Sequence, residues 1–327
     1  MDQHRKALRL GAWVILLAVT ARLASLDFFQ PLLDLLHDPK VQSFLIYIET
    51  GRNVRFSPSS GGFFRESPPP GLPEQETLPV FSAEDGCLDV YYSCGLRPDL
   101  EPLLEKELSW NLLGEAPSVL ILHTHATESY TKTEEQYLES AAFRTLDENY
   151  NMLSIGSRVA DILSGHGISV IHDRELHDYP SYDGSYNHAR RAIAYYLEKY
   201  PSIQLVLDLH RDASGDLSNQ LRTLATVDGR DSAQLMLVIG TDGAGLSHPN
   251  WQENLALGLK LQTVLEHLAP GITRPINLRS QRFNQDLSTG ALLVEVGAAG
   301  NTHSEARLAA EKLAEAILVL AGGTKSK

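Results

Sequence analysis

The chain has 327 residues, of which 43% are hydrophobic, and its 41 acidic and 28 basic side chains give a formal net charge of -13. This length predicts one sizeable domain with an appendage, because single domains usually contain roughly 100 to 200 residues. The acidic balance excludes a general nucleic-acid binder, since neutralising phosphates requires a basic face.

The N-terminal segment 1–30 is expected to be a signal or membrane anchor. Three basic residues at positions 5–9 precede an apolar run at 10–21, which is the order of charge and hydrophobicity in an export signal. The run is short for a span of roughly 20 residues, but 7–29 is long enough if its arginines snorkel. No A-x-A cleavage site follows, which favours an uncleaved anchor in the cell membrane with the rest of the chain outside. A buried amphipathic helix is the alternative.

Residues 31–115 are expected to form a membrane-proximal linker region. Its stretch 57–80 is rich in Pro and Gly, a composition that favours an extended chain over a packed element. Cys87 and Cys94 are the two cysteines of the chain, and a disulfide between them is one possibility in an exported protein. Two cysteines alone do not supply the four ligands of a structural zinc site.

A regular pattern of strands and helices begins near residue 116 and defines a domain over 116–322. Short apolar runs predict strands at 118–124, 168–171, 203–209, 222–227, 235–239 and 291–297. Helical periodicity predicts helices near 152–165, 187–199, 250–268 and 304–320. This alternation predicts an α/β fold with a central, mostly parallel sheet flanked by helices.

Three of the apolar runs end on groups that bind metals or move protons, at 118–128, 203–212 and 291–297. In an open α/β sheet, ligands gather at the carboxyl ends of the strands, so these residues are expected to converge. His125 and Glu128 follow the first run, and His210 ends the second. Two histidines, a carboxylate and a water form a common catalytic zinc set, which predicts a hydrolytic metal centre.

The neighbours of these residues leave several alternatives open. His123 is the alternative to His125, because period-two alternation sends both to the same face. Either Asp208 or Asp212 can accept the second imidazole N–H of His210 and fix its tautomer. The remaining candidates, His123, His172, His177 and His303, are interpreted as structural histidines.

Glu295 interrupts the apolar run Ala-Leu-Leu-Val-Glu-Val-Gly at 291–297. A carboxylate in such a run needs a partner or a function, and its desolvation suits a general base. The alternative is an ion pair with Arg211 or another arginine. Arg211 itself is expected to stabilise an oxyanion or to bind a substrate carboxylate, and its alternative is an ion pair with Asp212.

At these positions the sequence resembles the stage II sporulation protein P family. The resemblance covers about 116–320 and rests on the order of several motifs: His-Thr-His-Ala-Thr-Glu-Ser-Tyr (123–130), Pro-Ser-Tyr-Asp-Gly-Ser-Tyr (180–186), Asp-Leu-His-Arg-Asp-Ala (208–213), Asn-Gln-Asp-Leu-Ser (284–288), and Leu-Val-Glu-Val-Gly (293–297) with Asn301, Thr302 and Glu305.

The resemblance implies a zinc-dependent N-acetylmuramoyl-L-alanine amidase with the α/β fold of cell-wall amidases. It implies that His125, Glu128 and His210 bind Zn²⁺ and that Glu295 is the catalytic carboxylate. In the broader amidase group the acidic ligand lies at the start of the first helix, which makes Asp147 or Glu148 the alternatives to Glu128.

The family acts on peptidoglycan of the sporulation septum during engulfment. The resemblance therefore implies two partners: a lytic transglycosylase of the stage II sporulation protein D type (SpoIID-like) and a membrane protein of the stage II sporulation protein M type (SpoIIM-like). A Tyr-rich loop at 179–186 is expected either to line a sugar or peptide groove or to be a packed surface loop. The other functional classes are a zinc endopeptidase that cuts stem-peptide cross-links and a wall-binding module without catalysis.

Overall fold

The computed structural model describes residues 54–55, 65–66, 78–83, 86–108, 110–133, 143–213, 215–216 and 219–322. The anchor expected over 1–30 and most of the Pro/Gly-rich stretch lie outside these residues. Two compact units divide after Pro70; the described part of the first is β1 (Val54–Arg55), paired antiparallel with β2 (Arg65–Glu66). Among the described helices, none is long and apolar enough to cross a membrane.

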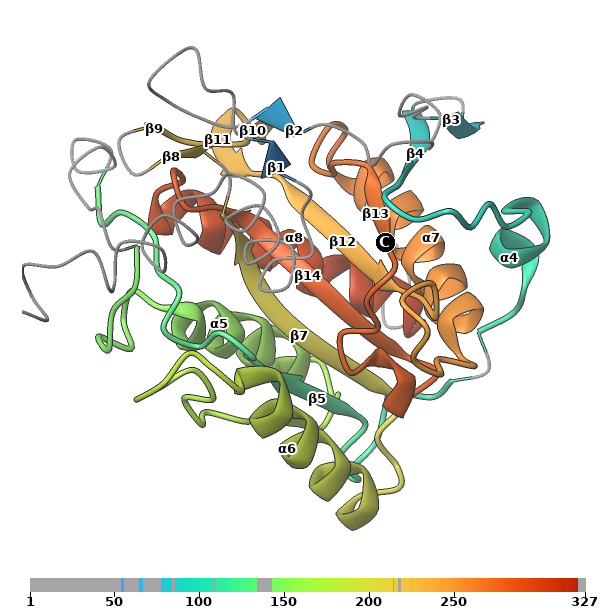
Figure 1. Ribbon diagram of the computed structural model, residues 1–327, viewed down its shortest axis with the longest axis horizontal. Helices are drawn as coiled ribbons and strands as arrows, with labels where there is room; N and C mark the ends of the chain where they lie inside the picture. Colours follow the sequence, from blue (N-terminus) through green and yellow to red (C-terminus); the bar gives the residue numbers. More distant parts are fainter. Residues whose placement is uncertain are drawn as a thin grey trace, which may run out of the picture. The chain divides into compact units, whose positions relative to one another are not determined.

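An eight-stranded sheet is the centre of the second unit (Figure 1). Five of its seven neighbouring pairs are parallel, which confirms the mixed α/β fold with a mostly parallel sheet. The strands in spatial order are β3 (Leu78–Ala83), β4 (Gly86–Tyr92), β13 (Ile276–Arg279), β12 (Leu235–Gly240), β14 (Ala291–Ala298), β7 (Leu205–Asp212), β5 (Val119–Leu122) and β6 (Val170–His172).

The sheet includes strands that lie before residue 116, where the sequence pattern places the start of the domain. Strand β4 pairs with β13, and neither strand is in the predicted set. The predicted strand at 222–227 forms β10 (Leu224–Val227), which pairs with β11 (Arg230–Ala233) in a hairpin outside the main sheet. A second small hairpin joins β8 (Gly215–Asp216) and β9 (Asn219–Gln220), and a short helix α4 covers Glu101–Glu105.

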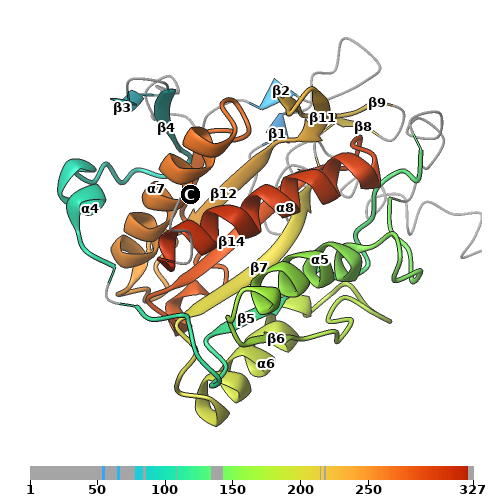
Figure 2. The same ribbon diagram turned by 180° about the vertical axis from the view of Figure 1, so that it is seen from behind.

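Helices cover both faces of the sheet. Figure 2 shows α8 (His303–Leu320) lying across one face between α5 (Met152–Gly165) and α7 (Trp251–Leu268). Their apolar side chains share one core with alternate residues of the central strands, such as Val119, Ile121, Leu207 and Val294. On the other face, α6 (Ser185–Lys199) packs on a second core that contains Leu120 and Leu122. The short helix η2 (Gln285–Leu287) precedes β14.

Two helices begin at well-formed caps. The side chain of Asn151 accepts a hydrogen bond from the Leu153 N–H at the start of α5. At the start of α8, Thr302 and Glu305 form a reciprocal capping box, which satisfies two backbone donors that the first turn leaves open. The caps fix where each helix leaves the strand-end loops beside the metal-ligand candidates.

The possible Cys87–Cys94 disulfide is not formed. Cys94 is a buried free thiol, and Cys87 lies in the extended strand β4, which runs to Tyr92. A strand rises about 3.3 Å per residue, whereas the Cα atoms of a disulfide lie within about 7 Å of each other. Strand geometry therefore separates the two cysteines.

Candidate metal centre

The three chemistry-bearing segments meet at one edge of the sheet. Strands β14, β7 and β5 are consecutive and parallel, so their carboxyl ends lie together. Glu295 is the register partner of His210 on the neighbouring strand. His125 lies in the turn directly after β5, and Glu128 follows that turn. The predicted convergence of the strand-end motifs is thus present in the fold.

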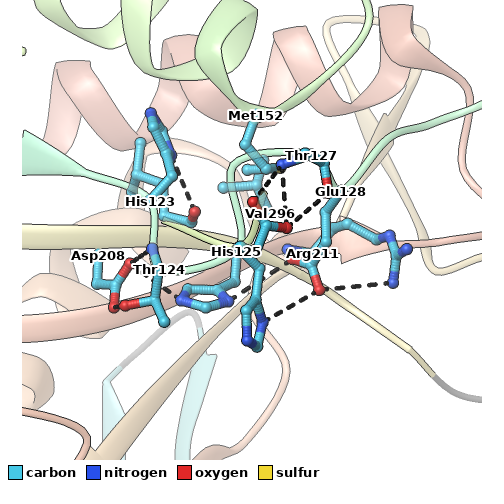
Figure 3. A network of polar contacts seen from close by, with 12 residues as sticks. His123, Thr124, His125, Thr127, Glu128, Met152, Asp208, Arg211 and Val296 are labelled. Carbon is cyan, nitrogen blue, oxygen red and sulfur yellow. Dashed lines mark hydrogen bonds and ion pairs between the residues drawn. The ribbon is translucent and has the colours of Figure 1, made fainter. Parts of the chain in front are cut away.

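His125, Glu128 and His210 form a compact cluster of buried ligand atoms. Nδ1 of His125 lies 3.4 Å from Glu128 Oε1, and Nδ1 of His210 lies 3.6 Å from Glu128 Oε2. One ligand atom from each residue fits within 4.8 Å of the other two. Figure 3 shows the Glu128 side chain extending toward His125 and Arg211.

The cluster fits a zinc ion by its donor chemistry. Two imidazoles and one carboxylate are the protein ligands of a common catalytic zinc set, which keeps a further position for water. Nε2 of His125 is buried and has no hydrogen-bond partner in the described part of the chain. A buried polar atom without a partner is costly, so this nitrogen is consistent with a site that binds a ligand.

Asp208 forms an ion pair with His210. Its Oδ1 lies 3.0 Å from His210 Nε2, and it accepts hydrogen bonds from the Thr124 N–H at 2.8 Å and the Thr124 hydroxyl at 2.6 Å. This leaves Nδ1 of His210 facing Glu128, as expected for a metal-bound histidine with a carboxylate behind it. Asp212, the alternative, instead pairs with Arg274 at 2.8 Å.

The neighbouring carboxylates favour the protonated form of His210 by raising its pKa. Burial lowers the pKa of His210, but Asp208 and Glu128 raise it by more, and the net pKa lies well above its ordinary value. Burial raises the pKa of Asp208, while His210 and Thr124 bring it down to about 2. A metal ion must displace this proton, because only the neutral imidazole is a ligand.

Zinc affinity is therefore expected to rise with pH. Because the pKa of His210 is raised, a metal ion that binds between about pH 6 and pH 8 must displace a proton from the imidazole. Protons compete less strongly with the metal ion as the pH increases. Competition with a chromophoric chelator at several pH values measures this slope. An affinity that is independent of pH over this range would contradict the protonated His210 of the metal-free site.

Glu128 remains ionised although it is buried. Burial raises its pKa, but Arg211, His125 and His210 outweigh this effect and hold the pKa well below its ordinary value. The Arg211 N–H donates to Glu128 Oε2 at 3.3 Å. The charge that a metal ligand requires is thus supported by the surroundings of Glu128.

The alternative acidic ligands lie elsewhere. Asp147 and Glu148 are exposed. Asp147 accepts hydrogen bonds from Asn149, and Glu148 forms an ion pair with Arg174 at 2.5 Å. Neither belongs to the cluster around His125.

His123 points away from the cluster. Its Nδ1 lies 3.0 Å from the Leu209 carbonyl and its Nε2 lies 2.9 Å from His172 Nε2. Burial lowers the pKa of His123 to about 3, so both rings can share one neutral hydrogen bond. The expectation that His123 and His125 share a face fails because β5 ends at Leu122, and a turn does not alternate.

A second group of potential ligands consists of Asp173, Glu175 and His177. Glu175 is exposed. His177 lies 3.1 Å from Asp173 Oδ2 in an ion pair between buried side chains, which matches its interpretation as a structural histidine. His303 likewise lies 2.7 Å from the Ser154 hydroxyl.

A bulge in β14 directly follows Glu295, the register partner of His210. The register between β14 and β7 shifts between Glu295 and Ala298, and bulges commonly re-aim side chains next to active sites. Gly297 has φ of 71°, and a Cβ there would lie 2.7 Å from Ala233 Cβ. The Asn301 side chain accepts the Ala298 N–H at 2.9 Å, so the bulge has a defined support.

Gly297→Ala is expected to lower the free energy of unfolding by about 1–3 kcal/mol, the usual cost of a non-glycine residue in the left-handed region. Chemical denaturation measures the change. Gly165→Ala is the matched control, because a Cβ at Gly165 meets nothing within 4 Å and alanine favours the helix. Equal stability of the Gly297 variant and the wild type would show that the bulge does not depend on glycine.

Arg211 is buried beside Glu128. Its side chain is only 4% exposed, and its guanidinium donates to the Ser129 carbonyl at 3.3 Å and the Phe143 carbonyl at 2.7 Å. These contacts favour a role in positioning Glu128 and its turn. The sequence also allowed an ion pair between Arg211 and Asp212, but Asp212 pairs with Arg274.

The Tyr-rich segment 179–186, whose last two residues begin α6, packs against His125. The Tyr182 ring stacks on His125 with a centroid distance of 4.5 Å, and the Tyr186 ring meets the same imidazole edge-on at 5.5 Å. The Asn284 side chain donates to the Tyr186 carbonyl at 2.8 Å. The motif at 284–288 thus helps to hold this loop against the metal-ligand candidates.

Sequence reasoning did not identify Arg144 and Asp178 beside the site. Arg144 NH1 donates to Asp178 Oδ2 at 2.8 Å, and the Thr127 hydroxyl donates to the same oxygen at 2.6 Å. Neither residue lies in an apolar run or a ligand-like spacing, so no local pattern indicates them. The sequence offers one indication of this network: Thr127, which contacts both residues, directly precedes Glu128.

Comparisons with known proteins agree with the sequence motifs. A family model described as stage II sporulation protein P (SpoIIP) matches residues 80–318. The chain is 26% identical over 213 residues to "Stage II sporulation protein P" of Bacillus subtilis (strain 168), an overlap of 62% of this chain and 50% of that protein. The chain thus spans about half the length of this relative.

Among solved structures, the chain is similar to N-acetylmuramoyl-L-alanine amidases. The amidase of Clostridium difficile 630 is 15% identical with a TM-score of 0.39, over 65% of this chain and 100% of that chain. The catalytic domain of CwlV from Bacillus (Paenibacillus) polymyxa var. colistinus is 12% identical with a TM-score of 0.39, over 63% and 99% of the two chains.

Proposed function

This chain belongs to the stage II sporulation protein P family, and from that premise we propose that it is a zinc-dependent hydrolase of peptidoglycan that acts in sporulation. The bond that it cleaves is the amide between N-acetylmuramic acid and L-alanine of the stem peptide. The observation that carries this proposal is the buried His125–Glu128–His210 cluster, with Glu295 in register beside His210.

In this proposal His125, Glu128 and His210 bind the zinc ion. When bound, zinc supplies Lewis-acid activation of water and of the scissile carbonyl. Asp208 keeps the His210 ring in place through its contact with Nε2. Arg211 positions Glu128 from behind, through the backbone hydrogen bond to Oε2 and through its ion pair with Oε1 at 3.9 Å.

Glu295 is the proposed general base and acid. Its carboxylate takes the proton from the attacking water and gives it to the leaving amine of L-alanine. The register pairing of Glu295 with His210 on the neighbouring strand supports this role, because strands hold site residues more precisely than loops do. Tyr182 and Tyr186 cover His125 and limit access of bulk water to that side of the cluster.

The proposed location is the outer face of the cell membrane. The basic and apolar pattern of segment 1–30 supports an N-terminal anchor, and the Pro/Gly-rich stretch supports a spacer that reaches the wall. The SpoIID-like transglycosylase and the SpoIIM-like membrane protein are proposed partners on the family resemblance. Peptidoglycan is the proposed substrate, and the net charge of -13 argues against nucleic acid.

Mass spectrometry of digested sacculi tests the proposed reaction. Purified protein loaded with zinc is expected to release stem peptides that begin with a free L-alanine amino group. New termini at the peptide cross-links would instead identify an endopeptidase. Binding to sacculi without any release would identify a wall-binding module, and either result would overturn the amidase proposal.

A further inference from the structure

Arg144 is a partly exposed arginine within reach of the His–Glu cluster. Its backbone pairs with that of Glu128 in an isolated antiparallel bridge, and its NH2 lies 3.6 Å from Glu128 Oε1. The guanidinium carbon lies 4.6 Å from the centre of the Tyr182 ring, which stacks on His125. One cation therefore contacts both a proposed ligand and the aromatic ring that stacks on His125.

One edge of the Arg144 guanidinium is fixed by the protein. NH1 donates to Asp178 Oδ2 at 2.8 Å and to the Thr127 hydroxyl at 3.2 Å. The Asp178 side chain is fully buried and also accepts the Thr127 hydroxyl. This network holds the guanidinium plane in one orientation, so a ligand that meets it finds a pre-organised donor.

The other edge, formed by Nε and NH2, has donor capacity left. Within the described residues its one contact is the 3.6 Å ion pair with Glu128, a separation that exceeds a hydrogen bond. The Arg144 side chain is 35% exposed. An Nε–NH2 edge matches the two oxygens of a carboxylate, which it binds by two parallel hydrogen bonds.

Arg211, the arginine that the sequence favours for a substrate carboxylate, lacks this access. It is 4% exposed, and its donors bind main-chain carbonyls. Arg144 is more exposed, and among the described residues its Nε–NH2 edge forms no hydrogen bond, while it lies beside the same Glu128 carboxylate. Arg144 is therefore better placed than Arg211 to bind an anionic group of a ligand.

Building on the proposed amidase activity, we propose that Arg144 binds a carboxylate of the stem peptide close to the scissile amide. The enzyme then selects peptides whose residue after L-alanine carries a free carboxylate over peptides that carry a carboxamide there. The two groups have almost the same shape, but the carboxamide has no charge and presents one acceptor oxygen instead of two. The preference for the acid peptide therefore depends on the two parallel, charge-assisted hydrogen bonds that the Arg144 guanidinium donates to a carboxylate.

Two muramoyl-dipeptides that differ only in this carboxylate or carboxamide test the proposal. The wild type is expected to bind the acid peptide more tightly than the amide peptide, by calorimetry on zinc-free protein and by KM on zinc-loaded protein. Arg144→Gln is expected to weaken acid binding by about tenfold to a hundredfold, the loss of a charge-assisted hydrogen bond. The same variant is expected to weaken binding of the amide peptide by less, because the carboxamide offers one neutral acceptor to Arg144, so the preference for the acid peptide is lost.

Two further variants separate recognition from structure. Arg144→Lys keeps the charge but not the fork, so it is expected to restore only part of the preference for the acid peptide. Arg158→Gln is the matched control, because Arg158 is 33% exposed and pairs with Glu311 at 2.9 Å between α5 and α8. This control is expected to keep the full preference.

Equal binding of both peptides by the wild type would overturn the proposal. So would an Arg144→Gln variant that keeps the preference, or one that loses zinc affinity and turnover for both peptides alike, since that pattern indicates a positioning residue. If the wild type binds zinc but cleaves neither peptide, the amidase proposal fails by itself. Calorimetry on the zinc-free protein still decides the role of Arg144 in that case.

Discussion

Replacement of His210 by alanine is expected to empty the metal centre and to stop hydrolysis. Only His125 and Glu128 remain from the cluster, and two protein ligands do not complete a catalytic zinc site. Zinc content is expected to fall from about one ion per chain to near zero. Elemental analysis after dialysis against metal-free buffer measures this change, and peptide release from sacculi measures the loss of activity.

The control for this variant is another buried histidine, His248. His248 is 1% exposed. Neither of its ring nitrogens has a hydrogen-bond partner in the described part of the chain. His248→Ala removes the same volume from a buried position but is expected to keep zinc. Full zinc content in His210→Ala, or equal loss in both variants, would refute ligation by His210.

Glu295→Gln is expected to lower turnover by about 10²- to 10⁴-fold, the usual contribution of general acid–base catalysis. The amide has nearly the same shape as the carboxylate but cannot accept the proton of the attacking water. Zinc content is expected to stay unchanged, because Glu295 is not one of the three clustered ligands. Steady-state kinetics on muropeptides, together with elemental analysis, measure both effects.

Asp147→Asn is the control for this substitution. Asp147 is an exposed carboxylate whose contacts are with Asn149 and Lys132, and its change to an amide is expected to leave both turnover and zinc content at the wild-type level. Retained turnover in Glu295→Gln would exclude Glu295 as the base. A loss of turnover in Asp147→Asn would instead favour a functional role for the acidic residues Asp147 and Glu148, which precede α5.

The motifs at the strand ends were predictable because they combine two strong local signals. An apolar run indicates a buried strand, and a charged or imidazole group at its end is costly unless it is used. Parallel strand direction then brings such ends together, as for Glu295 beside His210. The resemblance to a known family added the assignment of ligands, which spacing alone does not give.

The choice between His123 and His125 was not predictable from alternation. The strand ends at Leu122, so the direction of each later side chain depends on the turn that follows. Hydrogen bonds formed across the fold set that direction: His123 contacts Leu209 and His172. These partners are distant in sequence, and no local pattern encodes them.

The roles of the two arginines also depend on long-range packing. Arg211 lies within the Asp-Leu-His-Arg-Asp motif, which drew attention to it, yet the chain buries it against the carbonyls of Ser129 and Phe143. Arg144 has no motif of its own, and only the fold places it opposite Glu128. Strand β13 also escaped prediction, because its four residues give little local pattern without the neighbouring strands.

Diffraction from crystals of zinc-loaded protein, measured on both sides of the zinc absorption edge, tests the central claim most directly. We predict one strong anomalous peak within about 2.0–2.2 Å of a nitrogen of His125, a nitrogen of His210 and an oxygen of Glu128. A peak at Asp173, Glu175 and His177, the second group of potential ligands among the described residues, with none at His210, would contradict the claim.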